Sequence, residues 1–269
     1  MRSIVVLFAV VICIGLQSRA DSPDARALIE QGNAALSEGH VRDAIALFQR
    51  AVDTDPSSAK AHERLGATVS KEVISGNIRP SADSDLVERA QDHLQRAAEL
   101  APYAIRPLVE LAELDAVLAE RSDNNDERSD RYKNAQELLK KAIALKSGNA
   151  DLYLQLAKLE RDEFSPVLQQ AKARFKQSGP LPDAQLRQSL QQQYGDRIED
   201  AISNARKSSE MNASALPPLL LMSRLLKERA LLRDTPEQYA SDMHSADDWY
   251  RQFLINGGHT GAEGSGASR

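Results

Sequence analysis

Apolar residues recur along this chain at spacings of three and four residues, which is the period of a helix that buries one face. Two such stripes stand next to each other near the start, one over 28–36 and one over 44–52. No stretch alternates apolar and polar positions long enough to predict a strand. Helix-ending residues recur along the chain, at Gly39, Pro56, Pro80, Pro102 and Gly148. The pattern predicts an all-α fold.

Small side chains occupy fixed offsets within the first pair of predicted helices. In a 34-residue unit that starts at Ala25, the marked positions are Leu28 (4), Gly32 (8), Ala35 (11), Ala44 (20), Phe48 (24), Ala51 (27) and Pro56 (32). Small residues at 8, 20 and 27 let two antiparallel helices approach closely, and proline at 32 ends the second helix. A larger residue at 24 fills the gap toward the next unit. The set resembles the tetratricopeptide repeat (TPR) family.

The later units keep the spacing between one hairpin and the next, but not the spacing within each hairpin. Position 20 of one unit and position 8 of the next lie 22 residues apart, and both are small in four pairs: Ala44 and Gly66, Ala90 and Ala112, Ala135 and Ala157, Ala201 and Ser223. Extra residues fall at the turn inside each later hairpin, near 74–85, 119–131, 161–196 and 232–244. In the longest of these, Ser165-Pro166 and Pro182-Asp183 predict two further helix starts.

We therefore predict an α-solenoid of about five antiparallel hairpins over residues 24–255. The hairpins are expected at about 24–56, 58–101, 104–147, 149–212 and 215–255. Because the units repeat at roughly 45 residues, HEAT-like units are the alternative to TPR-like ones.

Both ends of the chain differ from the helical middle. Residues 1–20 hold Arg2, an apolar run over 4–16 and small residues at Ser18 and Ala20, which is the order of a secretory signal peptide. They predict export to a periplasm or the extracellular space, with an uncleaved membrane anchor as the alternative. After cleavage no remaining stretch is apolar enough to span a membrane. Residues 257–269 are rich in Gly and Ser and predict a disordered tail.

Composition narrows the chemistry that the chain can perform. The net charge is −5 and aromatic residues make up 4%, which argues against nucleic-acid binding. The single cysteine, Cys13, lies in the signal segment, so disulfides and cysteine-ligated zinc are excluded. No nucleotide-binding, nucleophile or metalloprotease motif occurs, and the five histidines are scattered along the chain, as surface histidines are. We expect no catalytic residue, cofactor or metal, and no enzyme activity.

Two local motifs resemble a calcium-binding loop and a glycosylation site. Asp123, Asn125 and Glu127 are spaced like the start of a calcium loop, but Arg128 stands where that loop needs glycine, so we reject calcium binding. Asn212 begins a glycosylation sequon at a predicted turn, and the sequence leaves its use open.

The TPR resemblance implies where a partner would bind. In that family the first helices of the hairpins line a concave groove that holds a peptide segment, and here those positions mix both charges, with cations toward the C-terminal end. The residues that we select as partner-binding candidates are Arg26, Asn33, Glu63, Arg106, Glu113, Lys158, Arg161 and Arg224. Glu110 stands where chaperone-type members hold a peptide carboxylate, so a clamp of that kind is rejected.

A second candidate surface lies in the last predicted helix, which carries Trp249, Tyr250 and Phe253. These aromatic residues either form an exposed edge for a partner or a second copy of the chain, or pack back onto Leu219, Met222 and Leu226. We predict an exported adaptor or scaffold that binds another protein. The alternatives are a membrane-tethered envelope assembly factor and the accessory domain of an enzyme, for which only the insert at 161–196 is large enough to form a site.

Overall fold

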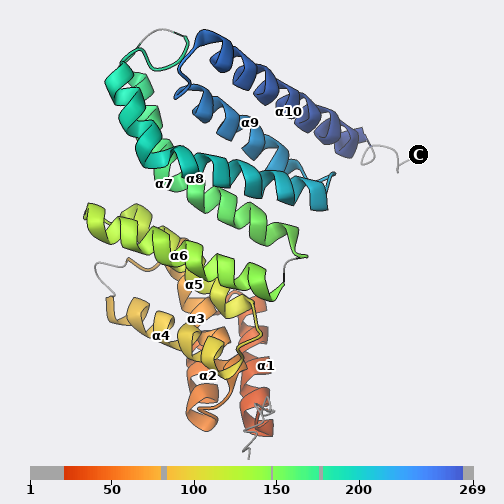
Figure 1. The fold of residues 1–269 in the computed structure, drawn as a ribbon. Coiled ribbons are helices and arrows are strands. Elements are labelled where there is room, and N and C mark those ends of the chain that lie inside the picture. The colour runs from red at the N-terminus through yellow and green to blue at the C-terminus, as the bar shows by residue number, and fades with distance from the viewer. Residues whose placement is uncertain (1–20, 80–83, 147, 176–177, 263–269) are drawn as a thin grey trace, which may run out of the picture.

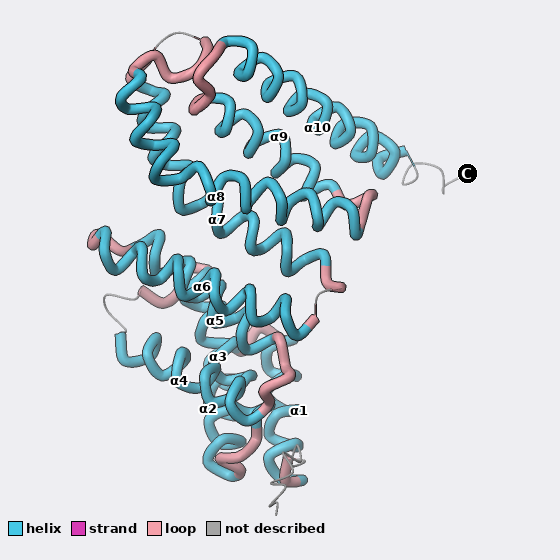
Figure 2. Tube along the Cα trace, viewed as in Figure 1, coloured by secondary structure: helices cyan, strands magenta, loops and turns pink. Residues whose placement is uncertain are grey.

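A computed structural model describes residues 21–79, 84–146, 148–175 and 178–262 of the chain, and in these residues every regular element is an α-helix (Figures 1 and 2). The predicted signal peptide with Cys13 lies outside the described residues. The helices of the described chain are α1 (Pro23–Ser37), α2 (Val41–Thr54), α3 (Ala59–Ile74), α4 (Ser84–Leu100), α5 (Arg106–Arg121), α6 (Asn125–Leu145), α7 (Ala150–Ala173), α8 (Ala184–Met211), α9 (Leu216–Ala230) and α10 (Pro236–Ala262).

The helices pack in consecutive antiparallel pairs, and the pairs stack on one another along the molecule (Figure 1). The closest partners are α1 with α2, α3 with α4, α5 with α6, α7 with α8, and α9 with α10. Each pair then packs on the next through its second helix. The predicted all-α solenoid of five hairpins is confirmed.

Glycines mark the places where two helices of one hairpin come closest. A Cβ atom on Gly32 would overlap the ring of Phe48, and one on Gly66 would lie 2.6 Å from Cγ of Leu94. Phe48 also shares an apolar cluster with residues of α3, so it fills the gap to the next hairpin as position 24 predicts. At Gly66 the close approach is to Leu94 and Ala90 of its own hairpin. Ala44, which precedes Gly66 by 22 residues in the repeat register, lies on α2 of the preceding hairpin.

The extra residues of the later hairpins mostly lengthen their helices. Only three residues, 122–124, separate α5 from α6, and α7 and α8 reach 24 and 28 residues. Asp183 caps α8 by accepting a hydrogen bond from the Leu186 N–H, which confirms that predicted helix start.

The helix start predicted at Ser165-Pro166 is wrong, because α7 runs through Pro166 without a break. Proline at this point removes one helical hydrogen bond and favours a kink. Phe164 and Leu168 on either side are fully buried in the core, and the Ser165 hydroxyl donates to Glu228 Oε1 at 2.6 Å. These contacts hold both halves of α7 in one helix.

The predicted disordered tail needs a correction at its start. Helix α10 continues to Ala262, so residues 257–262 are helical, and residues 263–269 lie outside the described chain. The Asn256 side chain donates to the carbonyl of Ala213 at 3.3 Å, and Gly257 lies beside Leu216. Residues 256 and 257 of α10 therefore contact the start of α9 and the turn before it.

The molecule divides into an N-terminal stack (α1–α6) and a C-terminal block (α7–α10). The block shares one large apolar cluster that draws on all four of its helices, whereas the stack has several smaller clusters. A further cluster of α5, α6 and α7 residues joins the two parts. Across the described residues, no helix combines the length and apolarity needed to cross a bilayer.

Candidate partner-binding groove

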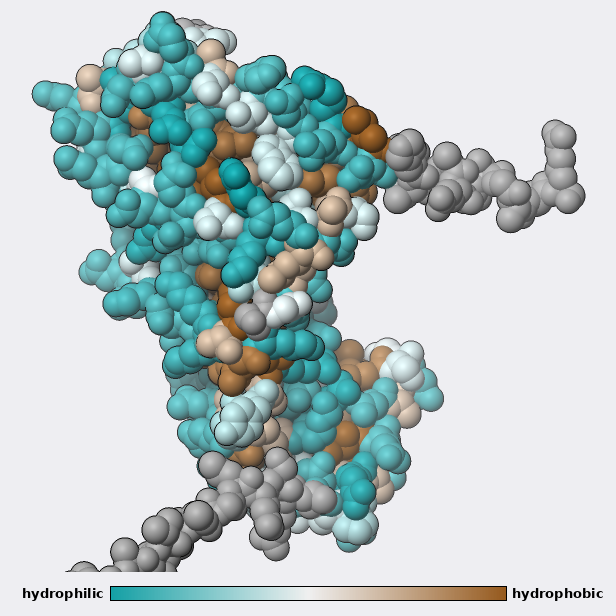
Figure 3. All heavy atoms as spheres, turned by 45° about the vertical axis from the view of Figure 1, so that its right-hand side comes forward, coloured by the Kyte–Doolittle hydropathy of each residue, from teal (hydrophilic) through white to brown (hydrophobic). Residues whose placement is uncertain are grey.

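The first helices of the hairpins carry the predicted groove residues, and most of these side chains reach solvent. Arg26, Arg106, Glu113, Lys158 and Arg224 are exposed, Asn33 and Arg161 are half-buried, and Glu63 is buried. The face in Figure 3 is mainly hydrophilic, with apolar atoms gathered in a narrow band and a hollow outline between the upper and lower parts. The candidates therefore divide into groups with different surroundings.

In the N-terminal stack the groove cation Arg106 is neutralised by acidic neighbours. Glu63 lies 3.0 Å from Nζ of Lys60 and 3.4 Å from Nε of Arg106, and Arg106 Nε also lies 3.5 Å from Oε1 of Glu110. Glu110 is buried, as is its second oxygen, which has no hydrogen-bond partner among the described residues. A peptide carboxylate gains little here, because Arg106 already has two acidic neighbours.

In the C-terminal block the groove opens into a pocket of about 420 Å³ between α7, α9 and α10, which we call the groove pocket. It brings together the predicted residues Lys158, Arg161, Arg224 and Phe253 with apolar and acidic neighbours. The other lining residues are Asp162, Leu216, Pro217, Leu220 and Leu221. The pocket thus combines three cations and one anion with an apolar wall.

The three cations of the groove pocket are not equally free. Arg161 donates to both oxygens of Glu228, at 3.0 and 2.5 Å, and to the Ser165 hydroxyl at 3.0 Å. Lys158 and Arg224 are exposed and form no ion pair with another described residue. Arg161 is therefore a structural residue of the wall, and Lys158 and Arg224 are the charges available to a partner.

The aromatic residues of α10 divide between the two alternatives. Trp249 is half-buried and packs against the core of the C-terminal block. Tyr250 is 42% exposed, its ring stacks on Phe253 at 5.9 Å, and Lys227 Nζ lies 5.7 Å from its centroid. Phe253 in turn lines the groove pocket. The exposed aromatic residue is thus Tyr250, and its half-buried stacking partner Phe253 borders the groove.

Sequence reasoning missed several residues of this site. Asp162, Leu216, Pro217 and Leu221 line the pocket, but none of them was selected as a partner-binding candidate. Glu228, which is buried and holds Arg161, was also missed. The apolar run at the start of α9 was a signal for the wall, but it is too continuous to show which of its residues face the groove.

Two of the histidines do not lie apart on the surface, as the sequence analysis expected. His62 is buried, and its Nδ1 lies 3.0 Å from Nδ1 of His93, so these two are not isolated surface residues. His62 Nε2 lies 3.2 Å from the carbonyl of Pro56 and donates to it. Burial lowers the pKa of both imidazoles. No group of three metal-ligating side chains exists in the part of the chain that the structure describes.

Comparison with known proteins supports the fold. No protein-family model and no curated protein sequence matches the chain. Among solved structures, MamA is similar with a TM-score of 0.57 and 14% identity, over 91% of this chain and 98% of that one. MamA 41-end from Desulfovibrio magneticus RS-1 has a TM-score of 0.55 and 13% identity, over 93% and 100%. A thermophilic TPR protein of Thermus thermophilus has a TM-score of 0.43 and 21% identity, over 75% and 98%.

MamA is a TPR protein, and the likeness covers nearly all of both chains. Together with the five stacked hairpins it shows that this chain has a TPR-like fold. At 13–14% identity it says nothing of what the groove holds.

Proposed function

We propose that this chain, an α-solenoid of the TPR type, is an exported scaffold that holds a segment of another protein in its groove. The observation that carries the proposal is the groove pocket. Its free cations, Lys158 and Arg224, stand beside an apolar wall that includes Leu220 and Phe253. A preformed groove of this kind binds without a cofactor or a covalent step.

The chemistry of the pocket favours an acidic segment that carries a large apolar side chain. Lysine and arginine heads that lack a partner attract carboxylates, and they steer an acidic segment toward the groove. A buried apolar anchor then supplies most of the affinity. Since Arg106 of the N-terminal groove already pairs with Glu63 and Glu110, we place the main binding point in the C-terminal block.

A peptide array tests this preference. The full chain is applied to peptides that combine Asp or Glu with Phe, Leu or Ile, and its binding is compared with a Lys158→Glu/Arg224→Glu variant. We expect at least a tenfold loss of affinity, which corresponds to roughly 1.4 kcal/mol. The matched control is Lys141→Glu/Arg206→Glu, which reverses two exposed charges on second helices. Equal binding by all three proteins, or an equal loss in the control, would contradict the groove.

Export rests on residues 1–20 and has its own test. The mature protein recovered from the producing cell should begin at Asp21 when its N-terminus is determined by mass spectrometry. Recovery of the intact N-terminus with the membrane fraction would favour the membrane-tethered assembly factor instead. Both forms leave the groove available.

A further inference from the structure

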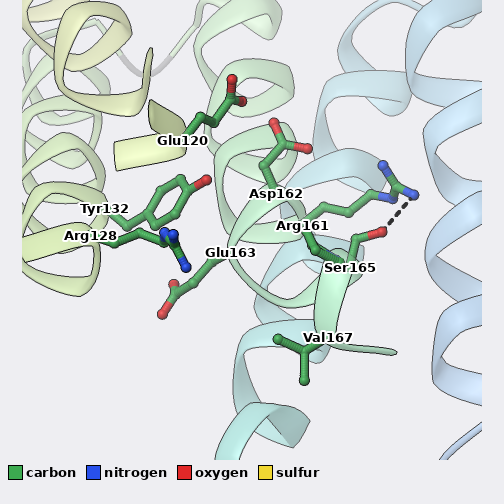
Figure 4. A pocket seen from close by; sticks show the side chains of 9 residues that line it. Glu120, Arg128, Tyr132, Arg161, Asp162, Glu163, Ser165 and Val167 are labelled. Carbon is green, nitrogen blue, oxygen red and sulfur yellow. Dashed lines mark hydrogen bonds between the residues drawn. The ribbon is translucent and has the colours of Figure 1, made fainter. Parts of the chain in front are cut away.

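A second cavity lies where the free end of the third hairpin meets α7, and we call it the junction cleft. It measures about 560 Å³ and its side chains are shown in Figure 4. The lining residues are Glu120, Arg128, Tyr132, Arg161, Asp162, Glu163, Ser165, Pro166 and Val167. Among the first helices of the hairpins, α1 packs on α3, α3 on α5, and α7 on α9, but α5 and α7 lack a comparable contact. The cleft lies at this gap in the stack.

Most of the charges around the cleft already have partners. Arg161 is held by Glu228 and Ser165, as described above. Glu163 pairs with Arg197 and accepts a hydrogen bond from Gln136 at 3.0 Å. Arg128 donates to the carbonyl of Ser122 at 2.5 Å and to Oδ1 of Asn125 at 3.1 Å. Arg161 and Glu163 are therefore held in ion pairs, and Arg128 is held by two neutral acceptors.

The carboxylates of Glu120 and Asp162 are different. Neither forms a hydrogen bond or an ion pair with any other described residue. Figure 4 shows them on facing elements of the cleft, Glu120 on α5 and Asp162 on α7. Pro166 has no N–H to donate to the main-chain carbonyl of Asp162, which leaves that carbonyl without its usual helical partner. Two carboxylates and one main-chain carbonyl at the cleft thus lack a hydrogen-bond donor among the described residues.

Tyr132 is an independent indication that a ligand belongs in the cleft. The residue is only 4% exposed, and its hydroxyl has no hydrogen-bond partner among the described residues. In Figure 4 the hydroxyl points into the space near Glu120 and Asp162. Burial and these two negative charges raise the pKa of Tyr132 to about 12, so the hydroxyl stays neutral. The ring is thus buried while the hydroxyl opens onto the cleft, where a bound ligand can form a hydrogen bond with it.

We propose that the junction cleft binds a primary ammonium group, with Glu120, Asp162 and the Tyr132 hydroxyl as its three acceptors. An alkylammonium head is a compact charge with three N–H donors, so three acceptors around one space match it. The group can belong to a free diamine or to a lysine side chain of a bound protein. Both sources share this chemistry, and the experiment below separates them.

Calorimetric titration of the full chain with 1,5-diaminopentane tests the site. We expect saturable binding by the wild type, at least tenfold weaker binding by Glu120→Gln, and no binding of 1-pentanol, which has no charge. Glu30→Gln removes an exposed carboxylate of α1 and should bind as the wild type does. Absence of diamine binding at about 10 mM, a concentration far above that of a specific site, or equal affinity in Glu120→Gln, overturns the proposal.

Tyr132→Phe separates binding from folding. Since the hydroxyl has no partner in the free protein, its removal should leave the melting temperature unchanged or higher, yet weaken diamine binding severalfold. Unchanged affinity in this variant would remove Tyr132 from the site. Because Glu120 and Tyr132 do not line the groove pocket, these results are independent of the peptide experiment above.

The source of the ammonium group follows from a second titration. N-acetyl-lysine methylamide presents the same head as a peptide-borne side chain, and its Nε-acetylated form is the control. Tighter binding of the lysine derivative than of the diamine assigns the cleft to a protein partner, and the reverse order assigns it to a free amine. Binding of the acetylated control as tightly as the lysine derivative overturns the proposal.

Discussion

The N-terminal stack and the C-terminal block use the same hairpin to build two kinds of core. In the stack each apolar cluster draws on two or three consecutive helices, so a hairpin depends chiefly on its neighbours. In the block one cluster runs through α7, α8, α9 and α10. Longer helices give the block a core nearer to that of a globular domain.

Both parts bury carboxylates that arginines neutralise. In the block these are Glu228 with Arg161, and Asp242 with Arg229 and Arg233 at 2.5 and 2.6 Å. In the stack they are Glu63 with Arg106 and Asp115 with Arg131, each at 3.4 Å. The comparison teaches that repeat number alone does not set cooperativity, because the length of the helices also matters.

The largest expected effect comes from removing one fully buried ring in each part. Phe164→Ala and Phe48→Ala should each cost about 3 to 5 kcal/mol, because both rings are fully buried. Hydrogen exchange should then separate them. Phe164→Ala should lower protection throughout α7–α10, whereas Phe48→Ala should lower it in α1–α3. Equal loss of protection over the whole chain in both variants would break the comparison.

The next effect is a pH dependence of opposite sign at two sites, Glu160 in the block and the histidine pair in the stack. Burial raises the pKa of Glu160 in α7 from 4.5 to about 7, although Asn204 donates to both of its oxygens. Between these values the folded chain holds a proton that the unfolded chain has lost, so stability falls as pH rises. Glu160→Gln should remove this dependence and be about 2 to 3 kcal/mol more stable than the wild type at about pH 8. Urea denaturation on either side of the pKa, at about pH 5 and about pH 8, measures the difference.

The histidine pair serves as the comparison for that experiment. Because burial lowers the pKa of His62 and His93 below 6.5, the unfolded chain takes up protons first as the pH falls, and the stack loses stability below that pH. His93→Gln should flatten this acid loss without changing the Glu160 dependence. An acid loss of stability that His93→Gln leaves unchanged would contradict the assignment.

The smallest expected effect tests how closely α3 and α4 pack at Gly66 in the stack. A Cβ on Gly66 would lie 2.6 Å from Leu94 Cγ and 2.9 Å from the Ala90 carbonyl oxygen. Gly66→Ala should therefore cost about 1 to 2 kcal/mol, since overpacking exceeds the gain in helix propensity. Gly148→Ala is the control, because a Cβ there meets nothing within 4 Å. Thermal unfolding by circular dichroism compares the two; a stabilised Gly66→Ala would show that α3 and α4 can move apart.

The sequence was enough to predict the hairpins, because small buried residues such as Ala90 and Ala112 keep the 22-residue spacing between one hairpin and the next. Pro166 was misread as a helix start because the local sequence rule takes no account of tertiary packing. Phe164 and Leu168 on either side of it are buried in the core and keep α7 continuous. The His62–His93 pair joins residues 31 positions apart across an enlarged hairpin, where the family register gives no guide. Of the groove, the charges were predicted and the apolar wall was not.

The hairpin tips have a practical consequence. Extra residues between α3 and α4 lie beyond the tight crossing at Gly66, and Gly76 and Asn77 at that tip are exposed. Lineages could therefore lengthen or shorten this tip without disturbing the scaffold, and an engineer can graft a reporter peptide there. A fluorophore at Asn77 would track the chain in living cells and leave both binding cavities intact.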